Sequence, residues 1–259
     1  MKSFVIESGF AMSDNKNEQL AKMYLQWLHD LREAAPLLLS EQYSNPYYVG
    51  IPEEWFDTDR PRILIVGEEG FGSWGCGKAG VLNDSDNPFY SAEDIQPIQS
   101  FTTNYLRTQL GLQCTSAYNK SPFWNRVRRV AKYGVCCWTN IDKIHRLSDK
   151  RCALHKKERI LLHTTLTRIL FEEIAVLQPT HIVFFGWYGI SLQHELPQLF
   201  EKLYPNGLKD DSVWKEKKIV SIDTEQYKTL FLYHPSWGYR NKGYERTVDE
   251  TLKTMFERE

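Results

Sequence analysis

The chain has 259 residues, of which 42% are hydrophobic and 25% are charged, so it is long enough to bury a large core in one domain. Its 32 Lys and Arg residues are nearly balanced by 33 Asp and Glu residues, which gives a formal net charge of -1. This balance argues against binding to nucleic acid through bulk positive charge, but it leaves open binding through a local basic face. No stretch approaches the roughly 20 apolar residues that span a bilayer, and the N-terminal sequence has no apolar run with a cleavage site, so we expect an intracellular protein without a membrane segment.

The N-terminal 60 residues are expected to form a helical and loop extension. Residues 17–35 carry apolar side chains at the spacing of an amphipathic helix, and Asn15 and Glu18 have the spacing of a capping box. An aromatic-rich loop is expected over residues 44–61.

Four short apolar runs predict buried strands. They are enriched in Val, Ile, Phe and Tyr, as is typical of strands buried on both faces. The runs comprise residues 62–67, 134–140, 180–186 and 228–234. Residues 121–134 and 155–179 are predicted to be helical, and Pro179 ends the second helix. Strands that alternate with helices indicate a parallel sheet with helices on both faces, and residues 217–223 form either an extra strand or a hairpin partner.

Polar side chains follow three of the predicted strands. Glu68 and Glu69 come directly after the first run, Asn140 ends the second, and His234 ends the last. Ligands bind beyond the carboxyl ends of parallel strands, so these carboxylate, amide and imidazole groups are expected to meet in one crevice. Each group also has a simpler interpretation, as part of a solvated turn, as a loop cap or as a turn histidine. Their occurrence at the same end of separate strands favours a functional site.

A competing motif lies after the first strand. Gly70, Gly72 and Gly75 have the GxGxxG spacing of a dinucleotide-binding loop. Two carboxylates that would repel a phosphate precede it, and no convincing helix follows. A dinucleotide enzyme is therefore kept as an alternative.

No metal site is predicted. The five cysteines include the adjacent Cys136 and Cys137 but no CxxC pair, and the spacing of His145, Cys152 and His155 matches no common zinc site. We expect buried thiols.

Four segments together resemble the uracil-DNA glycosylase superfamily. They are ILIVGEEG (63–70), CWTNIDK (137–143), ILFEEIAVLQPTHIVFFG (169–186) and YHPSWGYR (233–240), and they occur in the family's order. This order is most similar to the family-four type. The resemblance implies an α/β fold, a three-layer α/β/α sandwich with a central, mainly parallel four-stranded sheet, over residues 61–259. It also implies hydrolysis of the N-glycosidic bond of a flipped base.

The resemblance further implies roles for the residues at the strand ends. Glu69 falls where the family positions the hydrolytic water, and Glu68 matches the Glu of the GEAPG form, so either carboxylate is a candidate for this role. Asn140 matches the base-reading Asn, and His234 matches the His that supports the departing base. The iron-sulfur cysteines of the family-four type have no counterpart, so no cluster or other cofactor is expected.

A flipped base also needs a stacking platform, for which Trp74, Phe89 and Tyr90 are the candidates. The candidates for contact with DNA are Lys143, Ser236, Trp237, Tyr239 and Arg240. One predicted helix carries a basic cluster that suggests a modest phosphate footprint, made up of Arg126, Arg128, Arg129 and Lys132. Such aromatic residues also pack in cores, and such basic clusters also form solvated faces.

These expectations combine into a DNA glycosylase that excises a uracil-like, damaged or modified base from single- or double-stranded DNA. We expect a monomer that acts in the cytoplasm or at the nucleoid. The alternative is a catalytically inactive protein with the glycosylase fold that binds a nucleotide or nucleic acid.

Overall fold

A five-stranded sheet forms the centre of the computed structural model, which describes residues 9–34, 47–69, 96–112, 119–146, 156–186, 197–207 and 219–257. The strands are β1 (Arg62–Glu69), β2 (Val135–Asp142), β3 (His181–Phe185), β4 (Ile219–Asp223) and β5 (Lys228–Leu232). Their order is β2-β1-β3-β5-β4, in which β4 is antiparallel to β5 and the other neighbours are parallel. The mainly parallel sheet is confirmed, and β4 adds a fifth strand to the four that the resemblance implies.

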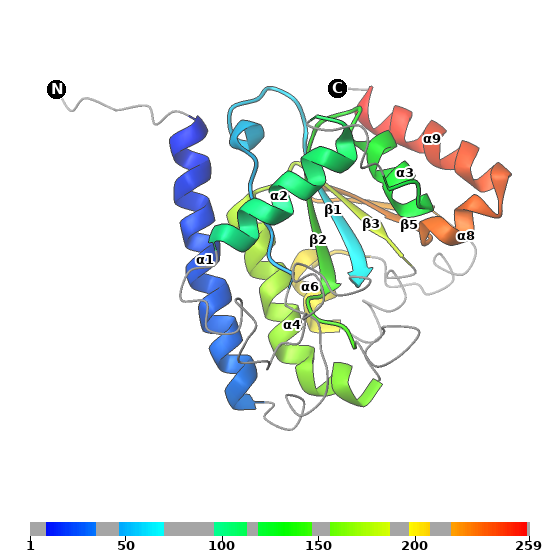
Figure 1. The fold of residues 1–259 in the computed structure, drawn as a ribbon. Coiled ribbons are helices and arrows are strands. Elements are labelled where there is room, and N and C mark those ends of the chain that lie inside the picture. Colours follow the sequence, from blue (N-terminus) through cyan, green and yellow to red (C-terminus); the bar gives the residue numbers. More distant parts are fainter. Residues whose placement is uncertain are drawn as a thin grey trace.

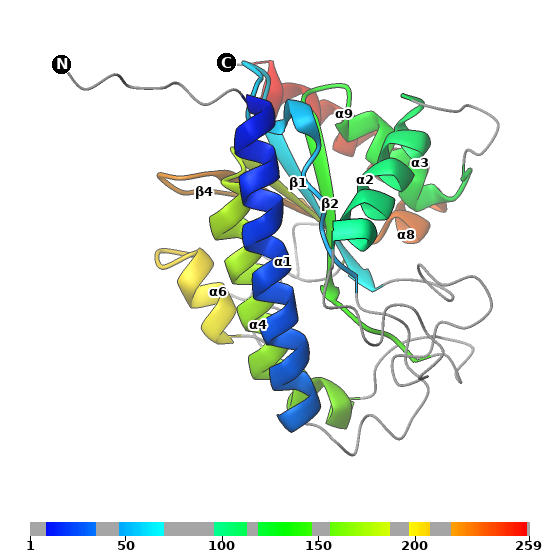
Figure 2. The same cartoon turned by 60° about the vertical axis from the view of Figure 1, so that its left-hand side comes forward.

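Helices cover both faces of the sheet, which gives three layers (Figure 1, Figure 2). On one face lie α1 (Gly9–Ala34), α4 (Lys156–Leu177) and α6 (Pro197–Leu203). On the other lie α3 (Pro122–Val130), α8 (Pro235–Tyr239) and α9 (Lys242–Phe256). A further helix, α2 (Gln96–Leu110), packs against α1, α3 and the edge strand β2. The α/β/α sandwich is confirmed, and none of the described helices is long and apolar enough to cross a membrane.

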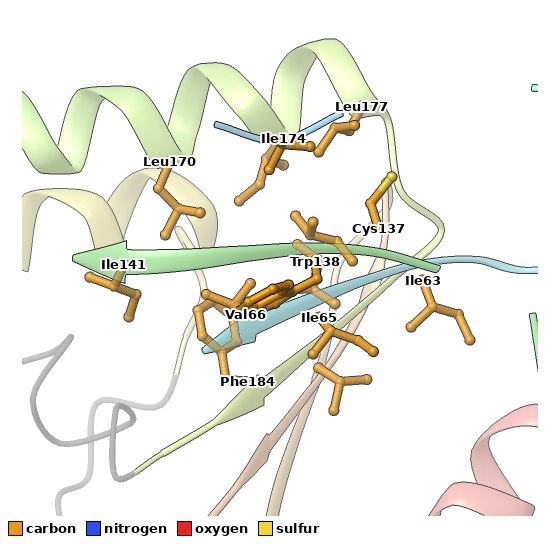
Figure 3. Close-up of a cluster of buried hydrophobic side chains, with 14 of the residues drawn as sticks. Ile63, Ile65, Val66, Cys137, Trp138, Ile141, Leu170, Ile174, Leu177 and Phe184 are labelled. Atoms are coloured by element: carbon orange, nitrogen blue, oxygen red, sulfur yellow. The ribbon is translucent and has the colours of Figure 1, made fainter. Parts of the chain in front are cut away.

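The core lies where apolar side chains of α4 meet the strands. Leu170, Ile174 and Leu177 point from α4 toward the sheet (Figure 3). The four parallel strands are buried on both faces, which explains their nearly continuous runs of branched and aromatic residues, whereas β4 has exposed residues. The helix ends at Leu177, and Gln178 adopts a positive φ of 48° before Pro179, so the predicted proline stop is confirmed.

The N-terminal segment packs into the same core. Trp27 of α1 and Trp55 of a short 3-10 helix (Glu53–Trp55) are buried. The Trp55 indole Nε1 donates a hydrogen bond to the carbonyl of Leu177, at 2.8 Å. The expected helical and loop extension is therefore attached to the sheet through apolar burial and through a hydrogen bond to the end of α4.

The first helix starts earlier than its sequence pattern predicts. It begins at Gly9, and both Asn15 and Glu18 lie exposed in its interior, so the predicted capping box is wrong. The hydroxyl of Ser13 donates to the carbonyl of Pro52, at 3.3 Å, which ties this early turn to the loop that follows the helix. Such a tertiary contact extends a helix beyond the point that local capping signals indicate.

Candidate functional site

The carboxyl ends of the four parallel strands lie along one edge of the sheet (Figure 1). Gly67 of β1 lies opposite Asn140 of β2, and Phe185 of β3 lies opposite Leu232 of β5, two residues before His234. The structure therefore brings Asn140 and His234 to the same edge. Three strand spacings separate β2 from β5 by roughly 14 Å, so a ligand that contacts both residues lies across the ends of β1 and β3.

The backbone of Glu68 and Glu69 belongs to this edge. Strand β1 extends through both residues, and Glu69 lies opposite Asp142 of β2. Their backbone is therefore strand rather than turn. Their side chains lie outside the part of the chain that the structure describes, as do the candidate stacking residues Trp74, Phe89 and Tyr90 and the glycines of the GxGxxG motif, so the roles of all of these stay predictions.

The Asn140 side chain is buried at the strand end, with 1% of the residue exposed. Its Oδ1 accepts a hydrogen bond from the Trp138 indole Nε1, at 3.2 Å. Its Nδ2 is also buried, and no group within the described ranges accepts a hydrogen bond from it. Asn140 lies inside β2 and caps no loop, so the loop-cap interpretation is wrong. A buried amide donor without a partner is costly, which makes this group a candidate contact for a ligand.

Gly67 makes room for this amide. A Cβ atom at position 67 would overlap the Asn140 Oδ1 and would lie 3.3 Å from the Phe123 ring. Any larger residue at Gly67 would therefore push the amide away from Trp138. The sequence alone does not predict this packing role of Gly67, because the close approach comes from the pairing of two strands.

Aromatic rings surround the indole that holds the amide. The Trp138 ring centroid lies 4.8 Å from that of Trp124 and 5.7 Å from that of Phe123, both on α3. Phe123 also contacts Phe185 of β3, at 5.5 Å between ring centroids. Trp138 is not among the site residues predicted from the sequence. The available signal was its position two residues before Asn140, since residues i and i+2 of a strand share a face.

His234 is the N-cap residue of α8. Its Nδ1 accepts a hydrogen bond from the backbone N–H of Ser236, at 3.2 Å. This bond requires an unprotonated Nδ1, so the neutral ring carries its proton on Nε2. Burial, together with the positive charge of Arg126, lowers the pKa of His234 from the usual 6.5. The neutral ring therefore caps α8 through Nδ1 and keeps its Nε2–H as a hydrogen-bond donor.

Arg126 connects α3 to the chain directly before His234. Its side chain is fully buried, and its guanidinium donates to the carbonyl of Tyr233 and to the carboxylate of Glu245 on α9. The guanidinium carbon lies 5.6 Å from the Phe185 ring centroid. Arg126 is therefore a structural cation that braces the His234 segment, and its expected place in a phosphate footprint is wrong.

The other arginines of α3 also have internal partners. Arg129 pairs with Glu245 and, at 2.8 Å, with Asp249. Arg128 donates to the carbonyls of Gln109 and Asn119, both at 2.9 Å. The arginines of this helix therefore form ion pairs and hydrogen bonds within the protein, because carboxylate and carbonyl groups from distant segments pack against the helix.

Lys143 is buried, and its assignment to DNA contact is wrong. Its Nζ lies 2.6 Å from both carboxylate oxygens of Glu173 on α4 and also contacts the Thr139 hydroxyl. Neither charged side chain of this pair is exposed to solvent. Burial lowers the pKa of Lys143, and the Glu173 carboxylate opposes that shift. A lysine held in this way cannot reach a phosphate at the surface.

The remaining candidates for DNA contact lie around α8. Ser236 and Arg240 are exposed, whereas Trp237 is half-buried and stacks on Tyr233 with 4.5 Å between ring centroids. The Tyr239 side chain lies outside the described part of the chain. Ser236 and Arg240 are therefore accessible to a partner, and Trp237 has part of its surface occupied by internal packing.

Other features of the described residues do not suggest a second reaction centre. Three hollows of about 590, 360 and 610 Å³ have walls that include neither Asn140 nor His234. Among the residues described, no cluster of His, Cys, Asp and Glu suits a metal ion. Cys136 and Cys137 are free and buried, as expected, and burial raises the pKa of the Cys136 thiol to about 12.

Comparison with other proteins adds no family assignment: no family model matches this chain, and no curated protein matches it. The chemistry of the site is therefore inferred from the residues at the strand ends.

Proposed function

We propose that this protein is a DNA glycosylase that hydrolyses the N-glycosidic bond of a flipped uracil-like, damaged or modified base. The observation that carries the proposal is the buried Nδ2 of Asn140, which has no acceptor among the described residues, at the strand edge that also holds His234. Leaving such a donor unpaired costs about 1 to 3 kcal/mol. A base that brings an acceptor to this position recovers that energy on binding.

His234 supports the same assignment through its proton position. With Nδ1 occupied by the Ser236 backbone N–H, the ring offers Nε2–H to a ligand. As the glycosidic bond breaks, negative charge develops on the leaving base and positive charge on the sugar. A neutral imidazole donor stabilises the charge on the base, as donors at an oxyanion site do. The lowered pKa of His234 keeps this ring neutral at physiological pH.

The carboxylates of Glu68 and Glu69 are assigned to the sugar side of the reaction. In the proposed step a water oxygen bonds to the anomeric carbon, the bond from that carbon to the base nitrogen breaks, and the base leaves with the electron pair. One of the two carboxylates orients the water and takes its proton, and its charge stabilises the oxocarbenium-like transition state. DNA itself is expected to contact the exposed Ser236 and Arg240.

A single-turnover assay tests the proposal. Purified protein is incubated with labelled oligonucleotides that carry uracil, hypoxanthine, or oxidised or alkylated bases, and alkali reveals abasic sites. We expect cleavage at one of these bases. Separate Glu69→Gln and Glu68→Gln variants identify the carboxylate that handles the water, because only that variant loses most of its turnover while it still binds the strand.

Asn140→Leu is the matched test of the base contact. It removes the buried amide and is expected to slow the reaction by about a hundredfold, the effect of one lost donor in a transition state. Asn15→Leu makes the same change at an exposed position of α1 and should leave the rate unaltered. Binding without an abasic product at any base would instead support the alternative, a glycosylase-fold protein that binds nucleic acid without cleaving it.

A further inference from the structure

The orientation of the Asn140 amide is set by a single donor. The indole nitrogen of Trp138 can only donate a hydrogen bond, so the amide atom that lies 3.2 Å from it must be the oxygen. The amide nitrogen is consequently the atom left without a partner among the described residues. If the amide turned over, its NH₂ group would face the indole N–H, two donors would oppose each other, and the hydrogen bond would be lost.

Trp138 itself has little freedom to move. Besides its contacts with α3, its ring lies 4.6 Å from the Tyr47 ring and 6.3 Å from the Tyr105 ring, measured between centroids. The Tyr47 hydroxyl also donates to the backbone carbonyl of Trp138, at 2.8 Å. The residue is 7% exposed. Rings from three separate segments therefore fix the direction in which its N–H points.

From this geometry we infer that Trp138 determines base specificity by holding the Asn140 amide with its NH₂ group toward the ligand. The inference rests on the proposed function. A base that places a carbonyl oxygen or another acceptor against this NH₂ group is accepted, whereas a base that places an amino group there meets two opposed donors. The preference for keto bases such as uracil over amino bases such as cytosine, which the proposed uracil-like substrate already implies, therefore depends on Trp138. Trp138 acts through Asn140 and is a positioning residue.

Trp138→Phe tests the inference, because it keeps an aromatic ring in the cluster and removes the N–H that fixes the amide. The probes are two oligonucleotides that differ at one nucleotide, 2′-fluoro-2′-deoxyuridine or 2′-fluoro-2′-deoxycytidine, whose fluorine slows glycosidic cleavage and lets equilibrium binding be measured. We expect the wild-type protein to bind the uracil probe at least about tenfold more tightly than the cytosine probe. In Trp138→Phe the ratio of the two Kd values should fall to about one, because the released amide can present either atom.

Trp124→Phe is the matched control. Trp124 lies next to Trp138 and is similarly buried, and its substitution removes the same N–H from the same aromatic cluster without touching Asn140. It should keep the wild-type ratio of Kd values. A general loosening of the cluster would change affinity for both probes in both variants, whereas the inferred role changes the ratio in Trp138→Phe alone.

A second variant covers the case in which Trp138→Phe does not fold. Gly67→Ala leaves the indole in place and displaces the amide oxygen from it, so it should also abolish the preference for uracil.

The outcomes separate the two proposals. If the wild-type protein prefers uracil and every variant that folds keeps this preference, the role of Trp138 is refuted and the proposed function stands. If the wild-type protein binds both probes equally, the specificity inference fails, and the cleavage assay decides the function separately. If it binds neither probe, the specificity inference fails as well, and the cleavage assay again decides the function.

Discussion

His234 illustrates how one ring can serve both structure and chemistry. The Ser236 backbone N–H occupies one ring nitrogen, and the buried Arg126 guanidinium that holds the Tyr233 carbonyl lies close enough to lower the pKa of the ring. The Arg126 guanidinium shares the Glu245 carboxylate with Arg129. The neutral form of His234 is favoured in the folded state.

This shift predicts a dependence of stability on pH. Because the pKa of His234 in the folded protein lies below the usual 6.5, the unfolded chain binds the proton more readily as the pH falls. The stabilising contribution is present above pH 6.5 and is lost as the pH falls through the folded pKa. The free energy of unfolding, measured by urea denaturation at a series of pH values, should therefore fall more steeply toward acid in the wild-type protein than in His234→Gln. Parallel curves for the two proteins would contradict the shift.

The buried pair of Lys143 and Glu173 links three elements of the fold. The same Glu173 carboxylate accepts hydrogen bonds from the Tyr24 hydroxyl on α1, at 2.5 Å, and from the Thr139 hydroxyl on β2, at 2.8 Å. Tyr24 in turn accepts from the backbone N–H of Val49, at 3.0 Å. One carboxylate on α4 thus accepts hydrogen bonds from the N-terminal helix, from the strand that carries Asn140 and from Lys143.

Removing this carboxylate should be severely destabilising. Glu173→Gln leaves the Lys143 ammonium buried without a counter-charge, and breaking a buried ion pair on one side costs about 3 to 5 kcal/mol. Glu172→Gln is the control, because Glu172 is the next residue of α4 and forms an exposed pair with Arg168 at 2.7 Å. Its cost should stay within about 0.5 kcal/mol. Urea denaturation measures both.

If Lys143 is replaced together with Glu173, as in Lys143→Met with Glu173→Leu, part of the lost stability should return, because no buried charge is left unpaired, while the Tyr24 and Thr139 hydroxyls lose their carboxylate acceptor. Equal stability of the wild-type protein and the Glu173→Gln variant would show that the pair contributes nothing to folding.

At the scale of the whole molecule, the described residues share one hydrophobic core, to which the N-terminal segment contributes. Leu20, Trp27 and Leu31 of α1 belong to the same buried cluster as the strands. Helix α1 packs along α4, the helix that covers one face of the sheet (Figure 2). Helix α1, which precedes the sheet domain predicted for residues 61–259, therefore completes one of the outer layers of that domain.

Deleting α1 should consequently prevent cooperative folding. A fragment of residues 47–259 exposes the side of α4 that α1 covers and loses the Tyr24 bond to Glu173. We expect a weak near-ultraviolet circular dichroism spectrum and a broad urea transition for this fragment, compared with a sharp transition for the full chain. Within the full chain, Leu31→Ala should cost about 2 to 5 kcal/mol, as large-to-small changes in a core do. A fragment that unfolds as sharply as the full chain would instead establish residues 47–259 as an autonomous unit.

The amino-acid sequence by itself determined the strands, the layered architecture and the edge at which Glu68, Glu69, Asn140 and His234 lie. It could do so because apolar runs and helical periodicity are local patterns, and because parallel strands leave their carboxyl ends on one edge. Boundaries were less predictable: α1 begins before its local capping signal, where a contact with the following loop extends it.

Only the tertiary structure decided what the charged and polar side chains do. Lys143 meets Glu173 across 30 residues of sequence, Arg126 meets Glu245 across 119, and Tyr24 meets Glu173 across 149. The local sequence around a basic residue does not show whether a distant carboxylate folds against it. Two residues expected to contact DNA or phosphate, Lys143 and Arg126, therefore turned out to be buried side chains in ion pairs within the protein. The direction of the Asn140 amide likewise depends on an indole that three other segments hold in place, and no spacing along the chain encodes that contact.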